Sequence, residues 1–205
     1  MTNKFIIKLN LTEEQLAILK SLQSRFIEVC NSISPVVLSN RCWNRVVLHH
    51  MVYHTMRQMY PDLGSQMICN AIYSVCRAYR ALLKFDETLL TKLDGVSAIV
   101  FSNTAPVFFD RHTLTLLKDK LSIFTLGGRM KVSVDLSVSD REHFNEEKLK
   151  EILLIGTGNE FSLHFYFGEH DHLNFDLVTE ENWPDNLLAS YLPTQENDSL
   201  TMVTL

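Results

Sequence analysis

The chain lacks the residue patterns on which several special architectures depend. It has four cysteines in 205 residues, with no CxxC pair and no second cluster at zinc-finger spacing. It has no low-complexity tract and no repeat of fixed period. No apolar run approaches the roughly 20 residues of a membrane-spanning helix, and the first residues do not resemble a secretion signal. We therefore expect a cytoplasmic protein with reduced thiols and no membrane association.

The charge of the chain is divided unevenly along its length. The formal net charge is −5, but residues 1–134 carry 16 Lys and Arg against 9 Asp and Glu, whereas residues 135–205 carry 3 against 15. A basic N-terminal part and an acidic C-terminal part indicate an anionic partner for residues 1–134 and a different partner for residues 135–205. Mutual attraction of the two halves, or a solvated tail, explains the same split.

The first forty residues predict a strand and then a helix. Residues 4–9 have polar ends and an apolar, β-branched centre, which indicates a short strand. Thr12 and Gln15 have the spacing of a capping box at a helix start. Apolar residues then recur at three- and four-residue steps, so we expect a helix to about Ser34, ended by Pro35.

Two further helices complete a bundle in this prediction. The second is expected from near residue 39 or 40 to Tyr60, where Pro61 stops it. The third is expected over about 64–85, with an apolar stripe along one face. Helices of this length need one another to bury their stripes, so the three predict a small bundle.

Short strands and tight turns dominate the sequence after Asp94-Gly95. Strands are predicted over 96–101, 106–109, 113–117, 120–126, 129–136, 149–155 and 161–167. The pairs Lys118-Asp119 and Gly127-Gly128 and the run Gly156–Asn159 supply hairpin turns. Repeated hairpins of this kind indicate a small antiparallel barrel or sandwich. Residues 169–205 are acidic and weakly patterned, with one short helix predicted near 185–191.

The order of these elements allows the first strand to pair with the later strands, so that the helices form an insertion. We predict an α+β fold, a small antiparallel β-barrel with a three-helix bundle inserted after its first strand. The predicted parts are residues 1–10, the first barrel strand; residues 11–94, the helical bundle; residues 95–168, the remainder of the barrel; and residues 169–205, an acidic C-terminal tail.

Several short sequence motifs carry a family resemblance. The opening strand is followed by Leu11-Thr12-Glu13-Glu14-Gln15, and Cys30-Asn31 lies near the end of the first helix. Tyr60-Pro61-Asp62-Leu63 with Gln66, and then Tyr79 and Lys84, mark the third helix. Pro106, Phe108, residues 121–126, Gly128-Arg129 and Lys131-Val132 mark a hairpin, and residues 152–155 and 161–165 mark a closing strand pair.

In their order, these motifs resemble those of the OrfB/TnpB-type proteins of bacterial transposons, the ancestors of type V CRISPR effectors. In that family a wedge-like β-barrel carries a helical recognition insertion, and a RuvC-like nuclease domain follows. Leu11 stands where the family usually has proline, and Cys30 stands where an aromatic residue is usual. The resemblance spans roughly residues 4–168.

The resemblance does not extend to the nuclease. A RuvC-like site needs three or more carboxylates on separate elements to hold two magnesium ions. Phe175-Asp176-Leu177 faintly echoes the family's first catalytic strand, but no glycine follows and too little chain remains to supply the other acids. The zinc-binding cysteines of that domain are missing as well. We therefore expect no enzymatic activity and no cofactor.

The resemblance implies that the bundle and the wedge hold guide RNA and the guide–target duplex, through a shallow basic surface that follows A-form phosphates. The expected contacts are Lys4, Lys8, Arg25, Arg45, Arg77, Arg80, Lys84, Arg129 and Lys131. The three on the third helix, residues 77, 80 and 84, share one face by their spacing, and residues 129 and 131 share one side of a strand. A solvated helix face and a solubilising hairpin are the open alternatives.

Two other groups of residues are candidates for different roles. Trp183, Leu187, Leu188 and Tyr191 form an isolated apolar helix face in the acidic segment, which favours docking of a partner protein. The same segment is alternatively disordered, or mimics DNA and covers the basic face. His50 and His54, and the pair His170 and His172, have no evident third ligand, so no metal site is predicted.

The sequence thus predicts a non-catalytic, nucleic-acid-associated subunit of a larger complex, in a mobile-element, CRISPR-like or phage-defence setting. Its expected partners are RNA or an RNA–DNA duplex, together with a partner protein or further copies of the chain. A protein–protein adaptor on the same scaffold, and the non-catalytic half of a split RuvC-type nuclease, remain alternatives.

Overall fold

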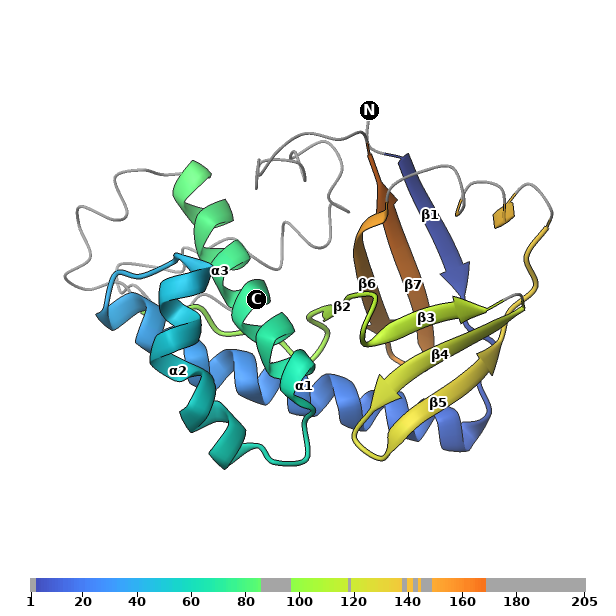
Figure 1. The fold of residues 1–205 in the computed structure, drawn as a ribbon, viewed down its shortest axis with the longest axis horizontal. Coiled ribbons are helices and arrows are strands. Elements are labelled where there is room, and N and C mark those ends of the chain that lie inside the picture. Colours follow the sequence, from blue (N-terminus) through green and yellow to red (C-terminus); the bar gives the residue numbers. More distant parts are fainter. Residues whose placement is uncertain are drawn as a thin grey trace. The chain divides into compact units, whose positions relative to one another are not determined.

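The computed structural model describes residues 3–85, 97–117, 119–137, 140, 141, 144 and 149–168. Three helices and seven strands are present in these residues (Figure 1). The chain divides into two compact units, which are called unit 1 (Met1–Gln23 with Pro106–Trp183) and unit 2 (Ser24–Ala105 with Pro184–Leu205). The division therefore falls inside the first helix.

A four-stranded antiparallel sheet forms the centre of unit 1. Its strands are β1 (Asn3–Lys8), β7 (Glu160–Phe167), β6 (Leu149–Thr157) and β2 (Val107–Phe109), in that order across the sheet. The whole of β1 pairs with β7, with Phe5 opposite Phe165 and Ile7 opposite Leu163 (Figure 1). The first strand of the chain thus joins strands from its second half, which confirms that the helices are an insertion.

A separate three-stranded sheet is made of β3 (Leu114–Leu117), β4 (Lys120–Thr125) and β5 (Gly128–Ser133). The expected hairpins are confirmed: β3 pairs with β4, and β4 pairs with β5 with Thr125 opposite Gly128. Gly128 has a φ of 108°, which a residue without a Cβ adopts most easily.

The prediction of a closed barrel is wrong, because the described strands form two antiparallel sheets. The break lies between β2 and β3. There the Asp110 carboxylate accepts hydrogen bonds from the backbone N–H groups of His112 and Thr113, each at 3.0 Å. These donors serve a local turn instead of a ladder, so the chain leaves the first sheet after the three residues of β2.

An aromatic cluster fills one face of the four-stranded sheet. The ring of Phe144 meets those of Phe5, Phe165 and Phe167 edge to face, at centroid distances of 5.3, 5.0 and 5.3 Å. Edge-to-face rings at these distances add to the free energy gained by apolar burial. The alternation of β1 places Ile7 in this core, whereas Lys4 and Lys8 remain exposed.

The first helix, α1 (Glu13–Ser39), begins as predicted. The Thr12 Oγ1 accepts a hydrogen bond from the Gln15 N–H at 3.2 Å, and the Gln15 side chain accepts one from the Thr12 N–H at 3.0 Å. This reciprocal capping box is confirmed. The Gln15 amide also donates to the Lys131 carbonyl at 3.0 Å, and Lys20 donates to the Asn159 side chain at 2.7 Å. The start of α1 is thereby attached to both sheets of unit 1.

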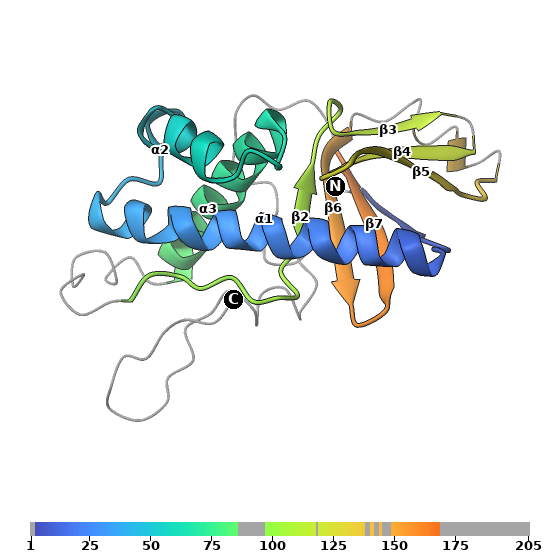
Figure 2. The same cartoon turned by 90° about the horizontal axis from the view of Figure 1, so that it is seen from below.

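In unit 2, the rest of α1 is joined by α2 (Arg45–Met59) and by α3 (Ser65–Phe85), which crosses α1 in Figure 2. The predicted stripe of α3 is buried, from Met67 and Ala71 to Leu82. Leu48, Val52 and Met56 form the buried face of α2. The three predicted helices are therefore present, although residues 13–23 of α1 belong to unit 1.

The predicted end of the first helix is wrong, because α1 continues through Pro35 to Ser39. A proline inside a helix costs about 3 kcal/mol. Pro35 lies on the exposed side, while Ile33, Ser34 and Val37 on the opposite side are fully buried, and this packing keeps the helix intact.

The helix ends instead at a Schellman-type turn. The Cys42 N–H donates to the Val37 carbonyl at 3.0 Å and the Arg41 N–H to the Leu38 carbonyl at 3.1 Å, with Arg41 at a φ of 48°. The second helix consequently begins at Arg45 and not near residue 40. Asn44 is its N-cap, and its side chain accepts hydrogen bonds from the N–H groups of Val46 and Val47.

Residues 97–101 do not form the strand that was expected there, apart from a single bridge at Val100. The segment is held to the helices by side chains. The Asn31 amide donates to the Phe101 carbonyl at 3.1 Å and accepts from the Phe101 N–H at 2.7 Å. Ser34 donates to the Ile99 carbonyl at 2.6 Å, and the Tyr79 hydroxyl accepts from the Ile99 N–H at 3.2 Å.

A substitution at Gly156 tests how closely the start of α1 packs on the sheet. A Cβ at Gly156 would overlap the Phe161 ring and lie 2.7 Å from the Gln23 Oε1, whereas nothing lies within 4 Å of a Cβ at Gly127. We expect Gly156→Ala to lower the free energy of unfolding by about 1–3 kcal/mol, and Gly127→Ala to change it by less than about 0.5 kcal/mol. Urea denaturation of both variants measures the difference, and equal effects would contradict this packing.

The stability of unit 1 is expected to fall at acidic pH because of His164 on β7. Its side chain is 9% exposed, its Nε2 lies 3.0 Å from the Ser162 Oγ, and its Nδ1 has no hydrogen-bond partner among the described residues. Burial, and secondarily the charge of Lys4, lower the pKa of His164 from 6.5 to about 4. The neutral ring therefore favours the folded state, and this contribution is complete above pH 6.5 and is lost as the pH falls towards 4.

Urea denaturation at pH 7.5 and pH 5, values chosen on either side of the ordinary histidine pKa of about 6.5, measures this effect. We expect His164→Gln to reduce the loss of stability between the two conditions, and His112→Gln, at an exposed turn position, to leave it unchanged. A loss of the same size in the wild type and in His164→Gln would rule out His164 as its source.

Candidate nucleic-acid interface

The helices α2 and α3 contain no Asp or Glu. They carry Arg45, Arg57, Arg77, Arg80 and Lys84, and across residues 29–85 the one carboxylate is that of Asp62. Exposed helix faces usually mix both signs of charge. A surface with cations and without carboxylates raises the local concentration of anions, so this pair of helices is the candidate site.

Arg45 is the exposed cation that the fold positions most clearly. The Asn44 cap fixes the start of α2, and Arg45 is its first residue. Its guanidinium Cζ lies 5.3 Å from the ring centroid of Tyr73 on α3. This cation–π contact holds the guanidinium at the seam between α2 and α3 without neutralising its charge. The planar donors of an arginine held in this way match a phosphate.

Arg80 lies on α3 one turn after the buried Cys76. Burial raises the pKa of the Cys76 thiol to about 12, and the positive charges of Arg80 and Arg45 both act to lower it. Tyr73, Arg77 and Arg80 also share one face of α3, at steps of four and three residues. The residues Arg45, Tyr73, Arg77 and Arg80 are called the α2–α3 seam below.

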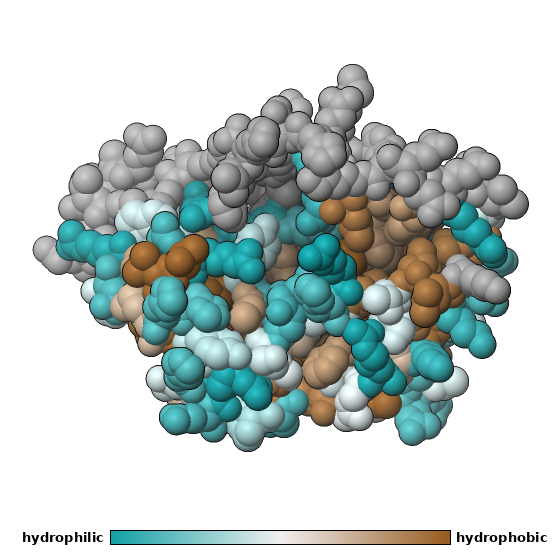
Figure 3. Space-filling model, in the orientation of Figure 1, coloured by the Kyte–Doolittle hydropathy of each residue, from teal (hydrophilic) through white to brown (hydrophobic). Residues whose placement is uncertain are grey.

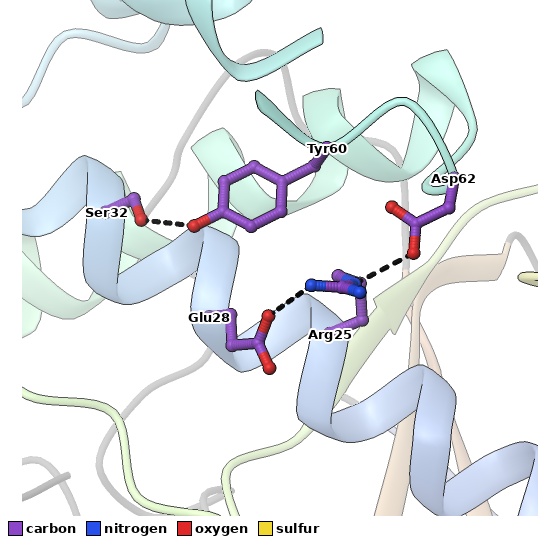
Figure 4. A network of polar contacts seen from close by, with 5 residues as sticks. All are labelled: Arg25, Glu28, Ser32, Tyr60 and Asp62. Carbon is purple, nitrogen blue, oxygen red and sulfur yellow. Dashed lines mark hydrogen bonds and ion pairs between the residues drawn. The ribbon is translucent and has the colours of Figure 1, made fainter. Parts of the chain in front are cut away.

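Arg25 is held by two carboxylates on the described part of the chain. Its guanidinium bonds the Asp62 carboxylate at 2.9 Å and the Glu28 carboxylate at 2.5 Å, and it lies 5.8 Å from the Tyr60 ring centroid (Figure 4). The Tyr60 hydroxyl lies 2.6 Å from the Ser32 Oγ. Arg25 thus connects α1 to the turn between α2 and α3, and two carboxylates balance its charge.

The predicted cations of unit 1 lie on two different strands. Lys4 and Lys8 are exposed on β1, with the Lys4 Nζ 5.8 Å from the Tyr166 ring centroid, and partial burial lowers the pKa of Lys4. Arg129 and Lys131 are exposed on one side of β5, as expected. Arg129 donates to the His112 carbonyl at 2.6 Å and to Ser122 at 3.2 and 3.3 Å. It therefore ties the hairpin together, whereas Lys131 remains exposed.

The structure brings some of the predicted contacts together. Arg77 and Arg80 share one face of α3 with Tyr73, over whose ring Arg45 lies, while the cations of unit 1 occur in pairs on β1 and β5. The side chain of Lys84 lies outside the described residues, as do Trp183, Leu187, Leu188 and Tyr191. Sequence reasoning missed Tyr73, although an aromatic residue four positions before Arg77 on the same helix face was the available signal.

The described residues offer little that points to a different kind of site. No three His, Cys, Asp or Glu side chains among them gather closely enough to hold a metal ion. None of the described helices combines the length and apolarity that crossing a membrane requires. No protein-family model matches the chain, and a comparison with curated proteins gave no match.

Proposed function

We propose that this chain is a non-catalytic, nucleic-acid-associated subunit that acts in a larger cytoplasmic complex. It resembles the front half of a TnpB-type RNA-guided nuclease, which holds guide RNA and the guide–target duplex. The proposal assigns the chain no catalytic role, because the residues that carry the resemblance are those of the nucleic-acid-holding part of the family.

The observation that carries this proposal is the α2–α3 seam. Arg45 is exposed at 5.3 Å from the Tyr73 centroid, Arg77 and Arg80 follow on the same face as Tyr73, and neither helix supplies a carboxylate. Cations that alternate with an aromatic ring on helices that carry no Asp or Glu of their own suit a phosphate backbone with exposed bases or sugars. Such a surface binds mainly through phosphate charge, so it favours structured RNA or an RNA–DNA duplex without strong sequence preference.

The chain topology supports the same assignment. The pairing of β1 with β7 around three inserted helices is the order that the resemblance implies for a wedge with a recognition insertion. We assign unit 1 the role of the wedge and unit 2 the role of the recognition bundle on that resemblance. The exposed Lys8 and Lys131 are then secondary contacts of unit 1.

A protein–protein adaptor on the same scaffold is the second candidate. The exposed apolar residues of α2 favour it, since Val46 is 66% exposed and Met59 is 56% exposed. Purification from native cells separates the two candidates, because bound RNA gives the ultraviolet absorbance of nucleic acid and a bound subunit gives a second protein band. The adjacent reading frames test the remaining alternative, a split nuclease whose RuvC-type half is a separate chain.

Removal of the Arg45 charge tests the nucleic-acid proposal directly. We expect the full chain to bind a fluorescent RNA hairpin and an RNA–DNA duplex at about 50 mM salt, and to bind more weakly as salt rises. Arg45→Gln should weaken binding several-fold and lower the slope of log affinity against log salt by about 1. Fluorescence anisotropy across a salt series measures both quantities.

The matched control is Arg111→Gln, which removes one exposed cation from the turn before β3 in unit 1. We expect it to leave affinity and salt slope close to those of the wild type. The proposal fails if the wild-type chain binds neither probe at low salt, alone or with the proteins that co-purify with it. If Arg45→Gln and Arg111→Gln weaken binding equally, the contact does not centre on the α2–α3 seam.

A further inference from the structure

The three-stranded sheet of unit 1 has one buried face and one exposed face. Alternation along β4 buries Leu121, Ile123 and Thr125, and the residues between them point to the other side of the sheet. Residues that pair across an antiparallel ladder lie on the same side. The exposed side, called the outer face below, therefore consists of Thr115, Leu117, Lys120, Ser122, Phe124, Arg129, Lys131 and Ser133.

The outer face carries cations and no carboxylate of its own. Lys120, Arg129 and Lys131 are exposed on it. Between residues 111 and 134 the one acidic residue is Asp119, in the turn at the opposite end of β4 from Phe124. Hydrophilic side chains lie next to hydrophobic ones on the surface over β4 and β5 (Figure 3). A surface of one sign of charge concentrates the opposite ion, so this face favours an anion.

Arg129 is held across the outer face by uncharged groups. Its guanidinium donates to the Ser122 Oγ at 3.2 Å, to the Ser122 carbonyl at 3.3 Å and to the His112 carbonyl at 2.6 Å. The side chain thus extends from β5 over β4 to the turn before β3. All three acceptors are neutral, so the positive charge remains at the surface. A phosphate can approach this guanidinium without displacing a carboxylate.

Phe124 gives the outer face its aromatic ring. It lies in the central strand of the sheet, is half-buried, and stands directly opposite Arg129. Residues in this relation have Cβ atoms about 4.5–5.5 Å apart, so the ring and the arginine are neighbours. The buried side of β4 is already filled by Leu121 and Ile123. The ring of Phe124 therefore belongs to the surface, where it offers a flat apolar area beside a fixed positive charge.

An unpaired nucleotide matches this combination. Its base has a free face that stacks on an aromatic ring, and its phosphate binds to lysine and arginine. The bases of a duplex are already stacked on one another and offer no such face. An acidic peptide would satisfy the cations but has no flat group for Phe124. The hydroxyl groups of Ser122 and Ser133 both donate and accept hydrogen bonds, so they tolerate different bases.

We propose that the outer face binds an unpaired segment of nucleic acid, with a base stacked on Phe124 and the neighbouring phosphates beside Arg129 and Lys131. This assignment rests on the proposed association of the chain with nucleic acid, but it uses residues of unit 1 alone. The outer face is a separate site from the α2–α3 seam, which is assigned to the phosphates of structured or paired strands. Since stacking does not read base edges, the site accepts different sequences.

Fluorescence anisotropy of the full chain with three labelled probes tests this site. The probes are an RNA–DNA duplex and single strands of uridine and of thymidine, each about 12 nucleotides long, a length that suits one small β-domain. We expect the wild-type chain to bind both single strands at low salt, and the ratio of the two affinities distinguishes RNA from DNA. Phe124→Leu should weaken single-strand binding at least about fivefold and leave duplex binding nearly unchanged. Phe124→Tyr keeps the ring and should keep the affinity.

A second variant and a matched control separate contact from stability. Lys131→Gln, at an exposed position, should weaken single-strand binding and lower the slope of log affinity against log salt by about 0.7. Tyr53→Leu removes a half-buried ring from α2 and should leave single-strand affinity unchanged. Ultraviolet cross-linking of the wild-type chain to oligouridine needs no substitution, and mass spectrometry should find the cross-link at Phe124.

The outcomes distinguish this site from the proposed function. Binding of the duplex without either single strand would overturn the outer-face site and leave the α2–α3 seam in place, whereas binding of no probe would overturn both. Equal effects of Phe124→Leu and Tyr53→Leu would show that no base stacks on Phe124. Cross-links confined to unit 2 would overturn the site even where a Phe124 variant fails to fold.

Discussion

The pairing of β1 with β7 is the contact on which the arrangement of the chain depends. The six residues of β1 pair with a strand more than 150 residues later, and β7 is the one neighbour of β1 among the described strands. Closing so long a loop costs conformational entropy, but the cost grows only with the logarithm of loop length. The burial of Ile7 and the partial burial of Phe5 against β7 offset it. Since β2 belongs to the same sheet, the chain returns to this sheet after the helices, and unit 2 contains α2, α3 and the part of α1 from Ser24 onward.

Residues 97–101, which follow the helices and precede β2, are held to α1 and α3 by hydrogen bonds from polar side chains and not by a β-ladder. Asn31 gives both a donor and an acceptor to the backbone of Phe101, as a neighbouring strand would. Aspartate lacks the donor and leucine lacks both groups, so the contact requires an amide. Ser34 and Tyr79 satisfy Ile99 in the same way. The asparagine that carries part of the family resemblance therefore has a physical reason within this fold, namely the attachment of residues 97–101 to α1.

Local signals in the sequence were sufficient where local contacts decide the structure. The capping box at Thr12 and Gln15, the hairpins around β4 and the end of α2 before Pro61 depend on residues close in sequence. The persistence of α1 through Pro35 depends on burial against distant residues, and the division into two sheets depends on a turn at Asp110, so neither could be read from periodicity. For the site, the common face of Arg77 and Arg80 followed from spacing. The hydrogen bonds of Arg25 to Asp62 and of Arg129 to the His112 carbonyl could not be predicted from spacing, because the partners lie 37 and 17 positions away in the sequence.

Arg25 and Arg45 show two ways in which a folded chain can hold a guanidinium, and the difference bears on what the bundle can bind. Arg25 is held by two carboxylates, so its charge is cancelled where it lies. Arg45 is held by the face of Tyr73, and a ring quadrupole orients a cation while leaving its charge and its outward N–H donors available. Had the seam needed only structural support, an ion pair such as that of Arg25 would have provided it. The Tyr73 ring orients Arg45 without adding a negative charge, and the two helices contain no Asp or Glu, so they contribute only positive formal charge to this part of the bundle.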